Sequence, residues 1–140
     1  MRYFAYGSNM DEGQMQQRCP GAKNISVAKL LGYRFDLDSE GFATVLTTPN
    51  TEVWGMLWEI SDDNKEILDR YEGVAKGSYR PVVMPVAHEV GITDALVYMS
   101  CRGRNTGKRT QGYLEKIMLA VDHWQLPEWY ISYVRTFLIN

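Results

Sequence analysis

The chain has 140 residues, of which 45% are hydrophobic, and its 15 basic and 17 acidic residues leave a formal net charge of −2 at pH 7. This length suits one domain spanning residues 1–140, and the near balance of charge gives no electrostatic reason to expect a nucleic acid or a membrane as a partner. The 2 cysteines are too few to staple a secreted fold, and no apolar run approaches the ~20 residues of a membrane span, so the expected compartment is the cytoplasm.

The first predicted element is a short aromatic strand at residues 2–6, which runs directly into turn-forming residues. Gly7, Ser8 and Asn9 favour a turn that leaves backbone N–H groups free to face a ligand. The same residues also form ordinary turns, so this segment needs a second signal before it indicates a binding site. A strand at this position also differs from a cleavable signal peptide.

The next predicted elements are a short helix and three strands. Asp11 is placed to cap a helix that continues to Arg18, and Pro20-Gly21 ends it. Strands are expected at residues 28–36, 42–46 and 53–60, and the last of these has the crowded apolar character of a central strand.

A second helix is predicted between Ser61 and Gly73. Ser61 and the acidic residues after it suit a helix N-terminus, Ile67 and Leu68 give the helix a buried side, and Gly73 marks its end. Two further strands are expected at residues 79–86 and 94–100. The first contains Pro81 and Pro85, which predict an edge strand or a bulged one.

The C-terminal part of the chain is predicted to be helical. Residues 110–124 form an amphipathic pattern with a single apolar face, made of Leu114, Ile117, Met118 and Val121. Pro127 suits the start of the last helix. Its inward-facing residues are expected to be Tyr130, Tyr133, Val134 and Phe137.

Five or six strands without regular alternation of strand and helix predict a mixed α+β fold. We expect a single domain with a curled sheet or small β-barrel and flanking helices.

The second signal lies at residues 68–74, where the sequence Leu-Asp-Arg-Tyr-Glu-Gly-Val places Glu72 directly before a glycine. Together with Tyr-Phe-Ala-Tyr-Gly-Ser-Asn at residues 3–9, this segment resembles the γ-glutamylcyclotransferase family, also called AIG2-like. Residues 53–58, 77–80, 111–114 and 126–130 also resemble family segments, in order, so the likeness covers nearly the whole chain. The resemblance implies a barrel of the kind expected above.

The family reaction is cyclisation of a γ-glutamyl group to 5-oxoproline with release of an amine, an amine-releasing reaction of lyase or acyltransferase type. The resemblance therefore implies a small-molecule γ-glutamyl substrate and no cofactor, with Glu72 as the general acid/base. A free glutamate titrates near ~4.3, so a base that works near neutral pH needs a pKa about 2 to 3 units higher. Tyr71 and Val74 are candidate neighbours that make its surroundings drier.

The resemblance also implies substrate contacts, mostly through backbone groups, at seven positions. They are Tyr3, Phe4, Ala5, Tyr6, Gly7, Ser8 and Tyr113. From the residues alone, Tyr3 and Phe4 are equally good core residues, and Tyr113 is equally suited to half-buried packing. Asn9 is suited to holding the loop through its side-chain amide.

The basic stretch, the histidines and the cysteines are weaker indications of function. Residues 102–109 lack the first glycine and the final Ser/Thr of a phosphate-binding loop, so this basic stretch predicts a solvated loop. If it lines the mouth of the site, it favours acidic leaving groups. His88 and His123 are far apart with no ligands at metal-binding spacing, so no metal site is expected. Cys19 and Cys101 are interpreted as buried or incidental thiols.

Two features bear on specificity. Phe42 stands where the family often keeps a small residue, in a stretch expected to wall the pocket. Gly-Ser-Asn at residues 7–9 favours the family branch that acts on γ-glutamyl amino acids, while the leaving amine and the oligomeric state stay open. Two other functions remain as alternatives: a binding protein that keeps the pocket without turnover, and a thiol hydrolase that uses Cys19 or Cys101.

Overall fold

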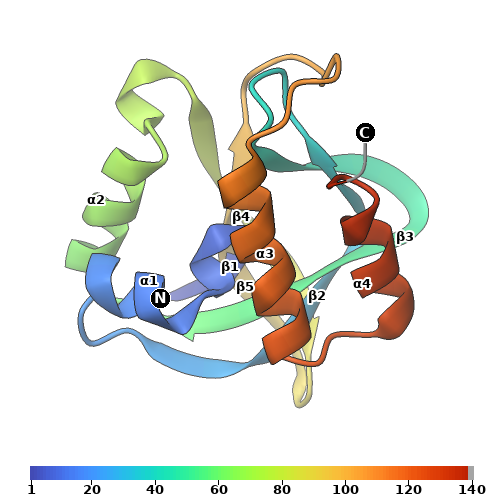
Figure 1. Ribbon diagram of the computed structural model, residues 1–140. Coiled ribbons are helices and arrows are strands. Elements are labelled where there is room, and N and C mark those ends of the chain that lie inside the picture. Colours follow the sequence, from blue (N-terminus) through green and yellow to red (C-terminus); the bar gives the residue numbers. More distant parts are fainter. Residues whose placement is uncertain (139–140) are drawn as a thin grey trace.

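The computed structural model describes residues 1–138 and shows a closed five-stranded barrel with four flanking α-helices (Figure 1). The strands are β1 (Arg2–Ala5), β2 (Lys23–Leu37), β3 (Ala43–Glu59), β4 (Tyr79–His88) and β5 (Gly91–Ser100). The α-helices are α1 (Glu12–Arg18), α2 (Asp62–Tyr71), α3 (Gln111–His123) and α4 (Glu128–Arg135). Two short 3-10 helices are η1 (Ser8–Met10) and η2 (Val74–Lys76). The expected mixed α+β fold with a small barrel is confirmed.

The barrel has the strand order β1-β3-β2-β4-β5. It closes where β1 runs parallel to β5, with Tyr3 opposite Leu96, and every other neighbouring pair is antiparallel. In Figure 1, α3 crosses in front of the barrel with α4 beside it, and α1 and α2 lie together on the other flank. Between residues 1 and 138, no helix is long and apolar enough to cross a membrane.

The two strands predicted at residues 42–46 and 53–60 are in fact one, β3. The segment between them, which contains the turn formers Pro49 and Asn50, forms a bulge opposite the register shift between Leu31 and Tyr33 of β2. Thr51 holds this bulge by donating its hydroxyl to the backbone carbonyl of Tyr33 at 2.7 Å. The partner strand β2 is also longer than predicted, and the two pair from Lys23–Glu59 to Leu37–Ala43.

Strand β4 accommodates its two prolines because most of it has one hydrogen-bonded neighbour. It pairs with β5 along its whole length without a register shift. Within the described part of the chain, its pairing with β2 is confined to His88 and Ala87, at the far end from Pro81. The edge-strand prediction therefore holds for the proline-containing stretch, and the bulge alternative does not.

The predicted caps set the ends of the helices that lead to the site. Asp11 accepts a hydrogen bond from the Gln14 backbone N–H at 2.8 Å and starts α1. Ser61 and Asn64 form a reciprocal capping box at the start of α2. This helix ends at Tyr71 with Glu72 as its C-cap, and Gly73 follows with φ 65°, a left-handed conformation that suits glycine.

The core lies inside the barrel and beneath α3 and α4. All four residues of the apolar face predicted for α3 are buried: Leu114, Ile117, Met118 and Val121. On α4, Tyr130 and Val134 are buried as expected, while Tyr133, and Phe137 just beyond the end of the helix, pack half-buried against the core.

Candidate active site

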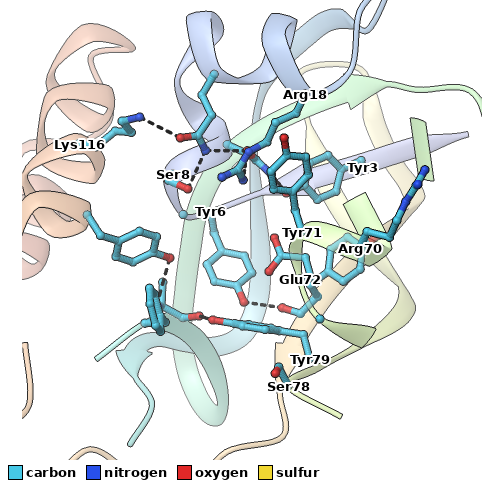
Figure 2. A pocket seen from close by; sticks show the side chains of 18 of the residues that line it. Tyr3, Tyr6, Ser8, Arg18, Arg70, Tyr71, Glu72, Ser78, Tyr79 and Lys116 are labelled. Atoms are coloured by element: carbon cyan, nitrogen blue, oxygen red, sulfur yellow. Dashed lines mark hydrogen bonds between the residues drawn. The ribbon is translucent and has the colours of Figure 1, made fainter. Parts of the chain in front are cut away.

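A cavity of about 560 Å³ opens where the η1 turn, the end of α2 and the first turn of α3 come together (Figure 2). This volume lies in the ordinary range for small-molecule sites, ~300–1,000 Å³. Six of the predicted site residues line it, from three separate segments of the chain. They are Tyr3, Tyr6, Gly7, Ser8, Glu72 and Tyr113.

Phe4 and Ala5 are the two predicted contacts that the structure does not bring to the cavity. Both are buried in the barrel, and both pair with β3, opposite Leu57 and Met56. Because β1 is part of the closed sheet, its middle residues serve packing and strand pairing. The cavity is reached by Tyr3 and by the residues where β1 ends.

Glu72 stands at the junction of α2 and η2, and it is the cavity's single carboxylate among the described residues. Burial raises the pKa of this carboxyl to about 7, while the charges of Arg18 and Arg102 act in the opposite direction. An ionised glutamate in this cavity is thus less favoured than in water, and the group changes its charge near neutral pH. The pKa is in the range that the sequence argument required of a base.

The dry surroundings of Glu72 come largely from tyrosines of the barrel. Tyr79 and Tyr98 line the cavity beside Tyr3 and Tyr6, and the pKa of each of these four hydroxyls is raised by burial and by the nearby Glu72 charge. The neighbour proposed from the sequence, Tyr71, is 59% exposed. Its ring instead carries the Arg18 guanidinium 4.2 Å from its centroid.

The turn after β1 is held by a network of amides. Gln14 donates its side-chain N–H groups to Ser8 Oγ and to Asn9 Oδ1, both at 2.8 Å. Asn9 also accepts from Arg18 at 3.1 Å and donates to the Tyr3 hydroxyl at 3.0 Å. The expected role of Asn9 in holding the loop is confirmed, and the network fixes Ser8 at the cavity wall.

Tyr113, in the first turn of α3, lines the cavity on the side that faces the Gly7 turn. Its hydroxyl accepts a hydrogen bond from the Ala43 N–H at 3.2 Å, and its ring packs edge-to-face on Phe42 with centroids 5.1 Å apart. A Cβ atom at Gly7 would lie 3.0 Å from the Tyr113 hydroxyl, so the glycine allows the two walls to approach. The Tyr113 hydroxyl proton has no acceptor among residues 1–138, which leaves it free to donate to a ligand. Phe42 lines the cavity, as expected from its sequence position.

The basic loop at residues 102–109 contributes one side chain to the cavity, Arg102. Its guanidinium forms an ion pair at 2.9 Å with Asp38, which is 1% exposed and also accepts from Ser100 Oγ at 2.7 Å. The guanidinium carbon Cζ of Arg102 lies 5.4 Å from the ring centroids of both Phe42 and Tyr79. The remainder of the loop stays outside the cavity.

Several lining residues escaped the sequence analysis: Arg18, Arg70, Lys76, Tyr79, Tyr98 and Lys116. Tyr79 and Arg70 lie in segments that resemble the family, at residues 77–80 and 68–74, so for these two a signal existed. The described part of the chain contains no group of three or more potential metal ligands. Cys19 is buried and Cys101 exposed, and neither lines the cavity.

The chain is similar to a known protein family and to named proteins. Residues 52–134 match the model of the AIG2-like family. The bovine gamma-glutamylcyclotransferase is 35% identical over 99 residues, which are 64% of this chain and 53% of that protein. The human protein of the same name is 34% identical over 99 residues, with the same coverage of 64% and 53%. The chain thus spans about half the length of the curated relatives it matches.

A solved structure of a gamma-glutamyl cyclotransferase superposes with a TM-score of 0.87 at 28% identity, covering 96% of this chain and 86% of that chain. The likeness extends over the barrel and the helices that flank it. Since the family match also takes in more than half of the sequence, the chain belongs to the AIG2-like family.

Proposed function

We propose that this protein is a γ-glutamylcyclotransferase, which converts the γ-glutamyl group of an amino acid or amine conjugate to 5-oxoproline and releases the amine. The observation that carries the proposal is Glu72, a carboxyl with a pKa of about 7 in a cavity shared with Ser8 and Tyr113. The names of the relatives at 34–35% identity support the same reaction.

In the proposed reaction the substrate attacks itself. The α-amine nitrogen of the glutamyl group bonds to its own γ-carbonyl carbon, and the amide bond to the leaving amine breaks. The attacking nitrogen loses two protons as the α-ammonium becomes the lactam N–H, and the leaving nitrogen gains two and departs as an ammonium. Glu72 takes the first proton before attack and passes it to the leaving nitrogen, then takes the second from the ring nitrogen and passes it to the released amine. It thus returns to its carboxylate form without water or a redox step. A pKa near 7 suits both halves of this transfer, because the group loses and regains a proton easily at neutral pH.

The wall opposite Glu72 supplies the donors that this reaction needs. Negative charge grows on the γ-carbonyl oxygen during attack, and fixed N–H or O–H groups stabilise it without reorganising. Candidate donors are the backbone of the Gly7–Ser8 turn and the hydroxyls of Ser8 and Tyr113. The Ser8 oxygen already accepts from Gln14, so its own proton is directed elsewhere. The cavity also folds the substrate for ring closure, an effect of orientation.

The reaction should depend on pH through Glu72. Because the carboxylate form is the base, we expect kcat/KM for a γ-glutamyl dipeptide to rise with pH through a midpoint near 7 and then level off. The measurement is a pH profile of kcat/KM from pH 3.5 to 9. A midpoint near 4.5, the value of an exposed glutamate, would show that Glu72 is not the titrating base.

The activity itself is tested by measuring 5-oxoproline release from L-γ-glutamyl dipeptides, γ-glutamyl amines and glutathione. The α-linked isomers are matched controls, because their amide offers no γ-carbonyl for ring closure. Release from a γ-linked compound but not from its α-isomer is the expected result. If no member of the panel yields 5-oxoproline while the compounds still bind, the chain is a binding protein and the proposal fails.

Alkylation separates this reaction from thiol chemistry. Iodoacetamide should modify the exposed Cys101 and leave activity nearly unchanged, since neither cysteine lines the cavity. Mass spectrometry of the treated protein establishes which thiol has reacted, and 5-oxoproline release gives the activity. Inactivation that tracks the modification, together with loss of 5-oxoproline release in Cys101→Ser, would favour a thiol mechanism.

A further inference from the structure

The charges around the cavity differ from those of the chain as a whole. The chain carries 15 basic and 17 acidic residues. Around the cavity the balance is five basic side chains to one carboxylate, Glu72. The basic residues are Arg18, Arg70, Lys76, Arg102 and Lys116. A third of the basic residues of the chain therefore line a cavity that has a single acidic side chain.

Within residues 1–138, most of this positive charge has no ion-pair partner. Arg102 is paired with Asp38 at 2.9 Å. Arg18 donates to the neutral amide of Asn9, and Lys116 donates to the neutral amide of Gln14 at 2.9 Å. Such bonds position a cation without cancelling its charge.

The two remaining cations are exposed lining residues that flank Glu72 in the sequence. Arg70 is in the last turn of α2, and Lys76 is at the end of η2. Neither has an ion-pair partner within residues 1–138. Both are exposed, so they are available to a ligand that enters the cavity.

The proposed reaction indicates which part of the substrate meets these two residues. Glu72 must come within hydrogen-bond reach of the leaving nitrogen to protonate it. If the glutamyl head occupies the Ser8 side of the cavity, the leaving group extends past Glu72 toward the rim. Figure 2 places Glu72 between Ser8 on one side and Arg70 on the other.

Building on the proposed function, we infer that the preferred leaving amine carries an additional negative charge, as an acidic amino acid does, and that Arg70 and Lys76 select it. Each exposed ion pair of this kind contributes a few-fold in affinity. Two together, in a cavity whose other cations add to the field, are expected to give about a 5- to 20-fold preference.

The test uses γ-glutamylglutamate and γ-glutamylglutamine, which match in size and differ in one charge. In the wild-type protein at low salt, kcat/KM should favour γ-glutamylglutamate by about 5- to 20-fold, mostly through KM, and added salt should reduce this ratio. The double variant Arg70→Gln/Lys76→Gln should bring the ratio close to 1. The matched control is Lys23→Gln/Arg80→Gln, which removes two exposed cations outside the cavity and should keep the wild-type ratio.

The outcomes separate this inference from the proposed function. Equal kcat/KM for the two dipeptides, with 5-oxoproline released from both, overturns the charge preference and leaves the cyclotransferase standing. Release from neither, with turnover of another γ-glutamyl compound of the panel, also overturns the charge preference alone, whereas no release from any member of the panel overturns both. If the double variant loses thermal stability and keeps the wild-type ratio of kcat/KM values, the two cations stabilise the helix ends rather than bind substrate, and the inference is overturned.

Discussion

Replacing Glu72 with glutamine should lower the rate of 5-oxoproline release by about 10²- to 10⁴-fold, the usual contribution of a general acid/base. Glutamine keeps the size and the hydrogen-bonding capacity of the side chain but cannot carry the proton from the α-ammonium to the leaving nitrogen. Substrate binding through the Ser8 and Tyr113 walls is expected to persist, so the loss should fall on kcat. Steady-state kinetics of Glu72→Gln with a substrate that the wild-type protein turns over gives the answer.

The matched control is Glu66→Gln, which makes the same change on an exposed residue of the same helix, outside the cavity. It should keep wild-type kinetics. If Glu72→Gln also keeps them, the proton is carried by another group and the mechanism proposed above is wrong.

The same variant should be more stable than the wild type at alkaline pH. The pKa of Glu72 is about 7 in the folded chain, above the 4.5 of an ordinary glutamate. Between these values the folded state binds more protons than the unfolded state, so the free energy of unfolding of the wild type falls as pH rises. Glutamine does not titrate, and the Tm advantage of Glu72→Gln should therefore grow from pH 5 to pH 8. Such a gain would also show that lost activity is not lost folding.

The sequence predicts well those features that depend on residues close together in the chain. The Asp11 cap and the Ser61 capping box follow from side chains that bond backbone groups three residues away. The apolar face of α3 follows from helical periodicity, because residues 114–121 repeat at the spacing of one helix face. These features were predicted with nearly correct bounds.

Features that depend on barrel closure are harder to predict from the sequence. Separate strands are predicted at residues 42–46 and 53–60, whereas pairing with the long strand β2 joins them into β3 through a bulge at Pro49 and Asn50. Tyr98 becomes a wall of the site because β5 closes the barrel against β1, a pairing that one sequence does not reveal. Arg18 joins the site through its stacking on Tyr71, a contact between α1 and the end of α2. The meeting of Glu72 with the Gly7 turn was predicted through the family resemblance rather than from physical patterns.

The junction of β1 and β3 carries the largest expected effect on stability. Gly55 of β3 lies beneath β1, and a Cβ atom there would stand 2.2 Å from the backbone oxygen of Ala5 and 3.1 Å from the Phe4 ring. Backbone in a closed barrel cannot move aside cheaply, so Gly55→Ala must push β1 away from its partner. Overpacking typically costs about 1 to 3 kcal/mol, and a clash with backbone belongs at or above the upper end of that range. We expect Tm to fall by about 10 °C or more, measured by calorimetry.

Gly112→Ala is the control, because nothing lies within 4 Å of a Cβ atom at that position of α3. It should unfold at or slightly above the wild-type Tm, since alanine is favoured over glycine in a helix. An unchanged Tm for Gly55→Ala would contradict this prediction, because it would mean that the space between Gly55 and the Ala5 oxygen is wide enough for a Cβ atom. The consequence extends to the site, because β1 leads directly into Tyr6 and Gly7. Where Gly55→Ala still folds, its displaced strand should shift the cavity wall opposite Glu72 and reduce 5-oxoproline release along with stability.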